Sequence, residues 1–316
     1  MSYCKLFTFV LAIVCLLPIA TLGQTPTTAQ NSPAPLGKLM DVGGYRVHLY
    51  CIGAGSPAVV IVGAGYSFDW GLVQPEVAKI TQVCSYDHSG IGWSDSGPND
   101  SCSLRVSEIH AALKNAEIKG PYVLVGHSLG GLVARVYTGR YPNEVTGMVF
   151  VDHAFSLIRG TIVAQAGKAP PPSATPAAPM LLNSGGGRAI GLEGDPNFSK
   201  LPSRDRELHL WAIAQTRDQA ALQHNHEVSM ECTGQADAIA KEHPQPLGDN
   251  PLVDVSTDMM RSPEYTKLQT DLLSLSRNSK EVIAEKSGHF VIIDRPDVVI
   301  DAITQVVQSV RNKTKL

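Results

Sequence analysis

A serine between small residues is the position of this sequence best suited to chemistry. The stretch from Leu124 to Tyr137 is LVGHSLGGLVARVY, in which an apolar run meets Gly-His-Ser-Leu-Gly and then apolar residues at helical spacing. A strand that turns sharply into a helix strains its turn residue, and Gly126 and Gly130 leave room for that turn. The start of the helix also directs backbone N–H groups to the same place. We therefore predict that Ser128 is a nucleophile.

A serine hydroxyl needs a general base, and His289 is the candidate. It lies in EKSGHFVIIDRP, after the last predicted strand. A third residue must orient the imidazole, and two aspartates satisfy the chain order Ser, Asp, His. Asp152 ends the strand VTGMVFVD cleanly and is preferred, whereas Asp258, after PLVDVST, stays open as the alternative. Asp254 lies within that second strand and is expected to be structural.

Acyl transfer also requires two donors for an oxyanion. The N–H of Leu129, which follows the serine, is the first candidate. The second is expected from the loop after PAVVIV, where GAG brings the backbone close, and Tyr66 N–H is our candidate. This loop resembles a dinucleotide fingerprint in part, but Phe68 stands where the third glycine belongs. No cofactor is expected.

The remaining histidines are weaker candidates. His127 adjoins the serine but is predicted to point elsewhere. His224, His226 and Glu227 form HNHE, and this pair of histidines without a third ligand at suitable spacing is typical of a solvated helix end. No metal site is predicted.

Strand and helix patterns alternate around these residues. This alternation predicts a parallel sheet covered by helices on both faces. The expected elements are a hairpin within 40–53, a short buried strand within 57–65, and a strand within 83–97 that runs into a Gly-rich loop. Further strands are expected at 122–126, 145–151, 251–257 and 281–285, and helices at 103–119, 129–140, 262–276 and 296–310.

The alternation stops after residue 152. The segment 153–248 contains GKAPPPSATPAAP and NSGGGRAIG, which cannot form core elements. Helical spacing resumes over 203–227. We expect a part-helical cap or lid at 153–248, inserted between core segments 39–152 and 249–316.

Several motifs together resemble the α/β-hydrolase superfamily, and specifically a secreted bacterial esterase or lipase. They are GAGYSFDW, YDHSGIGWSDSG, GPYVLVGHSLGG, VTGMVFVDHAF and SGHFVIIDRPDVVIDAI, within 42–152 and 250–303. The resemblance implies a mostly parallel central sheet flanked by helices, and a serine carboxylesterase with Ser128, His289 and Asp152 as its triad. A serine nucleophile argues against the dehalogenase and epoxide-hydrolase branches, which attack with an aspartate.

The N-terminus has the pattern of a secretory signal. MSYCK is a short positive region, residues 6–20 are apolar and uncharged, and small residues precede position 24. We expect a signal peptide at 1–23, a flexible tether at 24–38, no stable membrane span after cleavage, and a secreted or periplasmic protein. A retained anchor is the alternative, although the apolar run is shorter than the roughly 20 residues that a span needs.

Four cysteines follow the predicted signal: Cys51, Cys84, Cys102 and Cys232. Three pairings are possible. Cys51 and Cys84 each end a strand-like segment, which favours Cys51 with Cys84 and therefore Cys102 with Cys232. Four buried free thiols remain the alternative.

The charge balance excludes one class of partner. With 26 basic and 29 acidic residues, the net charge of −3 offers no surface for nucleic acid. The expected partner is a small-molecule ester with an apolar acyl group. An aminopeptidase, lactonase or acyltransferase of the same fold stays open, as does a noncatalytic ligand-binding protein.

Overall fold

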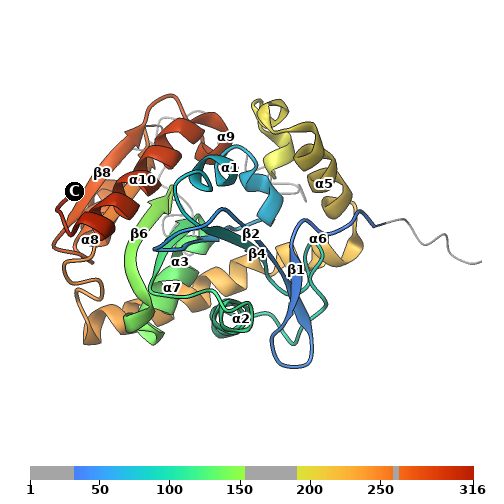
Figure 1. Ribbon diagram of the computed structural model, residues 1–316, viewed down its shortest axis with the longest axis horizontal. Helices are drawn as coiled ribbons and strands as arrows, with labels where there is room; N and C mark the ends of the chain where they lie inside the picture. The colour runs from blue at the N-terminus through green and yellow to red at the C-terminus, as the bar shows by residue number, and fades with distance from the viewer. Residues whose placement is uncertain (1–31, 154–190, 259–262) are drawn as a thin grey trace, which may run out of the picture. The chain divides into compact units, whose positions relative to one another are not determined.

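A mixed sheet of eight strands is built from the residues that the computed structural model describes, which are 32–153, 191–258 and 263–316 (Figure 1). The strand order is β1-β2-β4-β3-β5-β6-β7-β8. The β1–β2 and β2–β4 pairs are antiparallel and all other pairs are parallel. The strands are β1 Lys38–Asp41, β2 Arg46–Ile52, β3 Val59–Val62, β4 Val83–Asp87, β5 Tyr122–His127, β6 Val145–Val151, β7 Leu252–Thr257 and β8 Ser279–Ala284.

Helices cover both faces of this sheet, so its inner strands are apolar on both sides. In β5, Tyr122 and Leu124 pack with α2, α3, α7 and α8, whereas Val123 and Val125 pack with α1, α9 and α10. This arrangement confirms the predicted α/β-hydrolase fold class. The helices are η1 Ser67–Trp70, α1 Gln74–Val77, α2 Cys102–Asn115, α3 Leu129–Arg140, η2 Pro142–Glu144, η3 Leu192–Gly194, η4 Phe198–Lys200, α5 Ser203–Ile213, α6 Thr216–Gln223, α7 Asn225–Glu242, α8 Pro263–Leu273, α9 Val291–Asp294 and α10 Pro296–Asn312.

The element bounds agree with the predicted pattern most closely around the serine. Helix α3 and strand β6 have the predicted bounds, 129–140 and 145–151. Helix α2 ends at Asn115 rather than at residue 119, because Glu117 has a φ of 57°, which an α-helix cannot continue.

The segment between β6 and β7 is more helical than its sequence suggested. The single helical stretch expected over 203–227 is divided into α5 and α6, and a third helix, α7, continues to Glu242. On α7, Val228, Cys232 and Ala236 are buried at four-residue intervals, which is the spacing of one helix face. The Pro-rich part at 154–190 lies outside the described residues, and the cap bounds of 153–248 stay a prediction.

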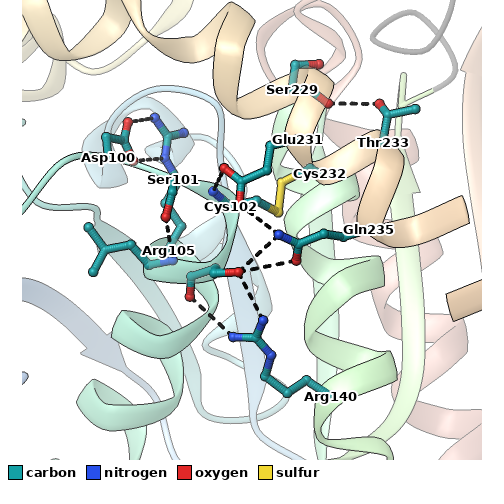
Figure 2. The surroundings of a disulfide bond; sticks show 12 residues. Asp100, Ser101, Cys102, Arg105, Arg140, Ser229, Glu231, Cys232, Thr233 and Gln235 are labelled. Carbon is teal, nitrogen blue, oxygen red and sulfur yellow. Dashed lines mark hydrogen bonds and ion pairs between the residues drawn. A yellow bond between two sulfur atoms is a disulfide. The ribbon is translucent and has the colours of Figure 1, made fainter. Parts of the chain in front are cut away.

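Helix α7 is fastened to α2 around a disulfide (Figure 2). Cys232 forms a disulfide with Cys102, the first residue of α2. The Cys102 N–H donates to Glu231 Oε2 at 3.0 Å, which satisfies one of the amides left free at a helix start. Gln235 Nε2 donates to Ser103 Oγ at 3.0 Å. Covalent and polar contacts therefore hold this part of the β6–β7 segment against the core.

The second disulfide joins neighbouring strands. Cys51 on β2 and Cys84 on β4 are register partners and are bonded to each other. Both predicted pairings are therefore present.

The N-terminal predictions fall mostly outside the described residues. The expected signal at 1–23 lies wholly there, as does the expected tether as far as residue 31, and β1 begins at Lys38. Across the described ranges, no helix is both long and apolar enough to cross a membrane.

The two disulfides are expected to differ in their effect on stability. They close chain segments with sequence separations of 130 and 33 residues. Chain entropy predicts that Cys102→Ser/Cys232→Ser lowers the free energy of unfolding by roughly 2–5 kcal/mol, and by about 1 kcal/mol more than Cys51→Ser/Cys84→Ser. Denaturant unfolding of both double variants measures the difference. A larger loss for the β2–β4 pair would contradict this account.

Candidate active site

Ser128 lies in the sharp turn that joins β5 to α3. Its φ of 54° is in the left-handed region, where a residue with a side chain is strained. A Cβ on Gly130 would overlap the Val62 carbonyl, and one on Gly126 would overlap the Gly131 backbone. Only glycine therefore allows the turn to close, and the closed turn leaves Ser128 partly exposed among buried neighbours.

The structure brings the three predicted triad residues together. His289 Nε2 lies 3.0 Å from Ser128 Oγ, and His289 Nδ1 lies 2.6 Å from Asp152 Oδ2. Asp152 is 3% exposed, and an ionised carboxylate there fixes the tautomer with a proton on Nδ1. The Nε2 lone pair then faces the serine hydroxyl, which is the arrangement that a general base requires.

Asp152, and not Asp258, contacts the histidine. Asp152 follows β6 directly, with a φ of 42°, and its N–H donates to Val255 O on β7 at 2.8 Å. Asp258 is exposed, and both of its carboxylate oxygens accept from Lys286 N–H at 3.2 Å.

The two predicted oxyanion donors have different surroundings. Leu129 is the first residue of α3, and its N–H has no backbone acceptor within the described part of the chain. Tyr66 N–H donates to Asp69 Oδ2 at 2.9 Å. Because this N–H is already hydrogen-bonded to a carboxylate, it is not available to an oxyanion, and the prediction of Tyr66 as second donor is wrong.

His127 has a position that the sequence did not reveal. Its Nε2–H donates to the carbonyl of His289 at 2.9 Å, and the two rings lie 4.8 Å apart. Burial, assisted by His289, lowers the pKa of His127 to about 3, so it is neutral at pH 7. It therefore connects the elbow to the loop of the base. The two residues are 162 positions apart in the chain, and only the motif position of His127 hinted at a role.

A second group of serine, histidine and aspartate is structural. His48 Nδ1 lies 2.8 Å from Asp87 Oδ2, and Ser67 N–H donates to Asp87 Oδ1 at 2.6 Å. His48 Nε2 accepts the Gly37 N–H at 2.9 Å, so this nitrogen cannot serve as a base. His48, Ser67 and Asp87 are at most 2% exposed. Their contacts fasten η1 to β2 and β4.

Asp254 is a buried acid beside the triad acid. It lies on β7 at 1% exposure, and Gln269 Nε2 donates to its Oδ2 at 2.9 Å. Burial, together with the charges of Asp152 and Glu281, raises the pKa of Asp254 to about 8. Asp254 is therefore predominantly protonated at pH 7, which removes a second negative charge from the neighbourhood of Asp152.

The HNHE residues lie at the start of α7. His224, His226 and Glu227 are exposed there. Over the ranges that the structure describes, no group of three or more His, Cys, Asp or Glu side chains is arranged to hold a metal ion.

Comparison with known proteins identifies relatives of both fungal and bacterial origin. A family model described as "Alpha/beta hydrolase family" matches residues 53–302. An uncharacterized protein of Schizosaccharomyces pombe is 42% identical over 89 residues, which are 28% of this chain and 16% of that protein. The 2-hydroxymuconate semialdehyde hydrolase of a Pseudomonas species is 34% identical over 131 residues, 40% of this chain and 46% of that enzyme. The chain thus spans less than half the length of either relative.

Solved structures share the fold at low sequence identity. A putative lipase from Acinetobacter baumannii has a TM-score of 0.62 and 18% identity, over 88% of this chain and 92% of that one. An epoxide hydrolase has a TM-score of 0.61 and 14% identity, over 87% of this chain and 99% of that chain. These likenesses establish the architecture and say nothing about substrate.

The comparison corrects the predicted localisation. A Saccharomyces cerevisiae relative, 32% identical over 129 residues that are 34% of this chain and 20% of that protein, is described as an uncharacterized vacuolar membrane protein. This description points away from a secreted or periplasmic protein, so that prediction is wrong. An apolar run after positive residues is typical of a signal for the secretory pathway, but its composition does not specify the compartment in which the protein ends. The bacterial secreted subtype is likewise unsupported.

The protonated state of Asp254 predicts a pH-dependent stability. Between pH 4 and 8 the unfolded carboxyl ionises while the native one, with its pKa of about 8, does not. The contribution of Asp254 to the free energy of unfolding is therefore fully present below about pH 4 and is lost as pH rises to about 8, by at most about 1.4 kcal/mol per pH unit. Asp254→Asn is expected to remove this slope, so its free energy of unfolding rises relative to wild type from pH 4 to 8. Asp258→Asn, at an exposed site, is the control, and parallel pH profiles for wild type and Asp254→Asn would refute the assignment.

Proposed function

The chain belongs to the alpha/beta hydrolase family, and we propose that it hydrolyses carboxylic esters of small molecules through an acyl-enzyme on Ser128. The observation that carries this proposal is the hydrogen-bonded series Ser128 Oγ, His289 and Asp152, with distances of 3.0 and 2.6 Å. A hydroxyl activated in this way attacks carbonyl carbon, and the resulting acyl-enzyme is released by water.

Each residue of the series has a defined step. His289 Nε2 takes the proton of Ser128 Oγ as the oxygen attacks the ester carbonyl, and then gives it to the leaving alkoxide. In the second half-reaction the same nitrogen activates water, which attacks the acyl carbon and frees Ser128. Asp152 stays ionised and stabilises the imidazolium in both steps.

The oxyanion is assigned to the N–H groups of Leu129 and Ala64. Leu129 N–H lies at the start of α3, where the helix dipole also favours negative charge. Ala64 comes two residues after β3, and its N–H has no hydrogen-bond acceptor within residues 32–153, 191–258 and 263–316. The Val62 carbonyl abuts Gly130 of the elbow, which brings this loop close to Ser128. Ala64 therefore replaces Tyr66 as the second donor.

A serine nucleophile favours acyl substrates over epoxides. If Ser128 opened an epoxide, the product would be an ether, which has no carbonyl for water to attack, and the enzyme would not turn over. An ester, a lactone or an activated amide gives an acyl-enzyme that can be hydrolysed. The epoxide hydrolases thus resemble this chain in fold but differ in the chemistry available to their nucleophile.

The segment 153–248 is proposed to act as a cap that selects the acyl group. Within its described part, Trp211 of α5 and Leu222 of α6 pack with the apolar cluster around Tyr66 and Phe68, next to the predicted oxyanion loop. This apolar lining supports substrates with an apolar acyl group. An aminopeptidase, lactonase or acyltransferase would use the same triad, and substrate competition distinguishes them.

A mechanism-based probe tests the nucleophile. A fluorophosphonate is expected to add once to wild type and not to Ser128→Ala, because only an activated serine is phosphonylated. Intact mass measures the adduct, and a p-nitrophenyl ester series of increasing chain length measures turnover. Amine-terminated substrates turned over in preference to esters would indicate an aminopeptidase. A folded wild type that binds ligand without an adduct or turnover would mean a noncatalytic binding protein.

The two aspartates give a matched test of the triad acid. Asp152→Asn is expected to lower kcat for p-nitrophenyl esters by about 10⁴-fold, because the amide stabilises the wrong histidine tautomer. Asp258→Asn should stay within about twofold of wild type, since its carboxylate contacts only the backbone of Lys286 among the described residues. The reverse ranking of the two kcat values would overturn the assignment.

A further inference from the structure

A buried histidine joins the β6–β7 segment to the oxyanion loop. His209 of α5 is 3% exposed, and both of its ring nitrogens face carboxylates. Nδ1 lies 2.7 Å from Asp69 Oδ1 of η1, and Nε2 lies 3.2 Å from Glu193 Oε2 of η3. Since a neutral imidazole has only one N–H, two carboxylate partners call for the doubly protonated ring.

The charges around His209 agree with this state. Burial opposes protonation, but Asp69 and then Glu193 outweigh it and raise the pKa of His209 to about 10. Other charged groups near this cluster include two ion pairs, Asp205 with Arg204 on α5 and Asp218 with Arg217 on α6. Asp87 of β4 adds a further carboxylate near Tyr66. The carboxylates outnumber the cations here, which favours a positive ring.

Asp69 transmits this contact to the loop after β3. Its Oδ1 binds His209, while its Oδ2 accepts the Tyr66 N–H at 2.9 Å. The same Oδ2 lies against Gly65, where an added Cβ would come within 2.7 Å of it. One carboxylate therefore fixes the turn that carries Ala64 and is itself held by a cation from α5.

Aromatic rings shield the contact from water. The Tyr66 ring meets His209 edge-on at 5.4 Å, and the Phe198 ring lies 5.3 Å from it. In such low-dielectric surroundings a paired charge is held strongly, and an unpaired carboxylate is costly. Loss of the His209 charge should therefore displace Asp69 and the turn with it.

We propose that His209 is a positioning residue for acyl transfer, which holds Asp69 and through it the turn bearing the second oxyanion donor. This inference rests on the proposed function for its catalytic consequence. It also makes oxyanion stabilisation depend on the docking of α5 against η1, so a part of the inserted segment that does not touch the triad controls the rate of the chemical step.

The first test compares His209→Gln with His226→Gln, at an exposed position of α7. His209→Gln is expected to lower kcat for a p-nitrophenyl ester at least tenfold, but less than the roughly 10²–10³-fold cost of removing an oxyanion donor, with KM changed less than threefold. His226→Gln should match wild type. An unchanged kcat, or a loss confined to KM, would overturn the proposal.

A double-mutant cycle asks whether His209 acts through Asp69. If it does, His209→Gln adds little to the loss of kcat already caused by Asp69→Asn. Independent, multiplying losses would overturn the proposed route.

Backbone hydrogen exchange tests, without an activity measurement, whether His209 holds the turn through Asp69; we call this contact the clamp. In His209→Gln, amides of residues 62–73 are expected to exchange at least tenfold faster, while those of 225–242 do not change. If wild type fails to turn over esters or to take up the fluorophosphonate, the proposed function falls, and the exchange result still decides whether the clamp exists. Unchanged exchange over 62–73 would refute it.

A milder variant covers the case in which His209→Gln does not fold. Glu193 has a side chain 33% exposed, and Glu193→Gln keeps an oxygen near His209 Nε2 while removing a charge. The pKa of His209 should then fall from about 10, so the alkaline loss of kcat should begin about one pH unit lower than in wild type. An alkaline limb at the same pH in both proteins would count against the clamp.

Discussion

The left-handed backbone of Ser128 is the constraint around which the site is arranged. The β5–α3 turn closes only because Gly126 and Gly130 lack a Cβ that would meet neighbouring backbone. Closure places the start of α3 against the end of β3 and lifts the hydroxyl above the sheet. Parallel strands β5 and β6 then bring their carboxyl ends to the same edge, where Asp152 meets the histidine that follows β8. The strain at one residue is thus maintained by a sheet whose inner strands are buried on both faces.

Local patterns were sufficient to predict the parts of the fold that are governed by local rules. The bounds of α3 and β6 follow from apolar spacing between clear start and stop signals, and Asp152 was found because β6 ends on it. The sequence did not predict α7 beyond residue 227, because few side chains form its buried face and they are small. Cys232 and Ala236 of this face pack against α2 and α3. Its stability comes from that packing and from a disulfide, and neither is visible as strong periodicity.

Contacts distant in the chain account for the errors within the site. Tyr66 stands at a reasonable place for an oxyanion donor, but Asp69 captures its N–H, and Asp69 is oriented by a histidine 140 positions later. His127 binds a carbonyl 162 positions away. Two buried histidines of one protein therefore have different charge states. His127 is neutral because it is buried beside another histidine, whereas His209 is cationic because it is buried between carboxylates.

The disulfide between Cys102 and Cys232 has a topological consequence. It closes the chain between these residues into a covalent ring that contains Ser128 and Asp152 but not His289. A protease that cuts the chain once anywhere between Cys102 and Cys232 therefore opens the ring without releasing a fragment. The cut protein would migrate as one species until a reductant separates its two pieces. Ser128 and Asp152 thus stay joined to the rest of the molecule after a single break between Cys102 and Cys232.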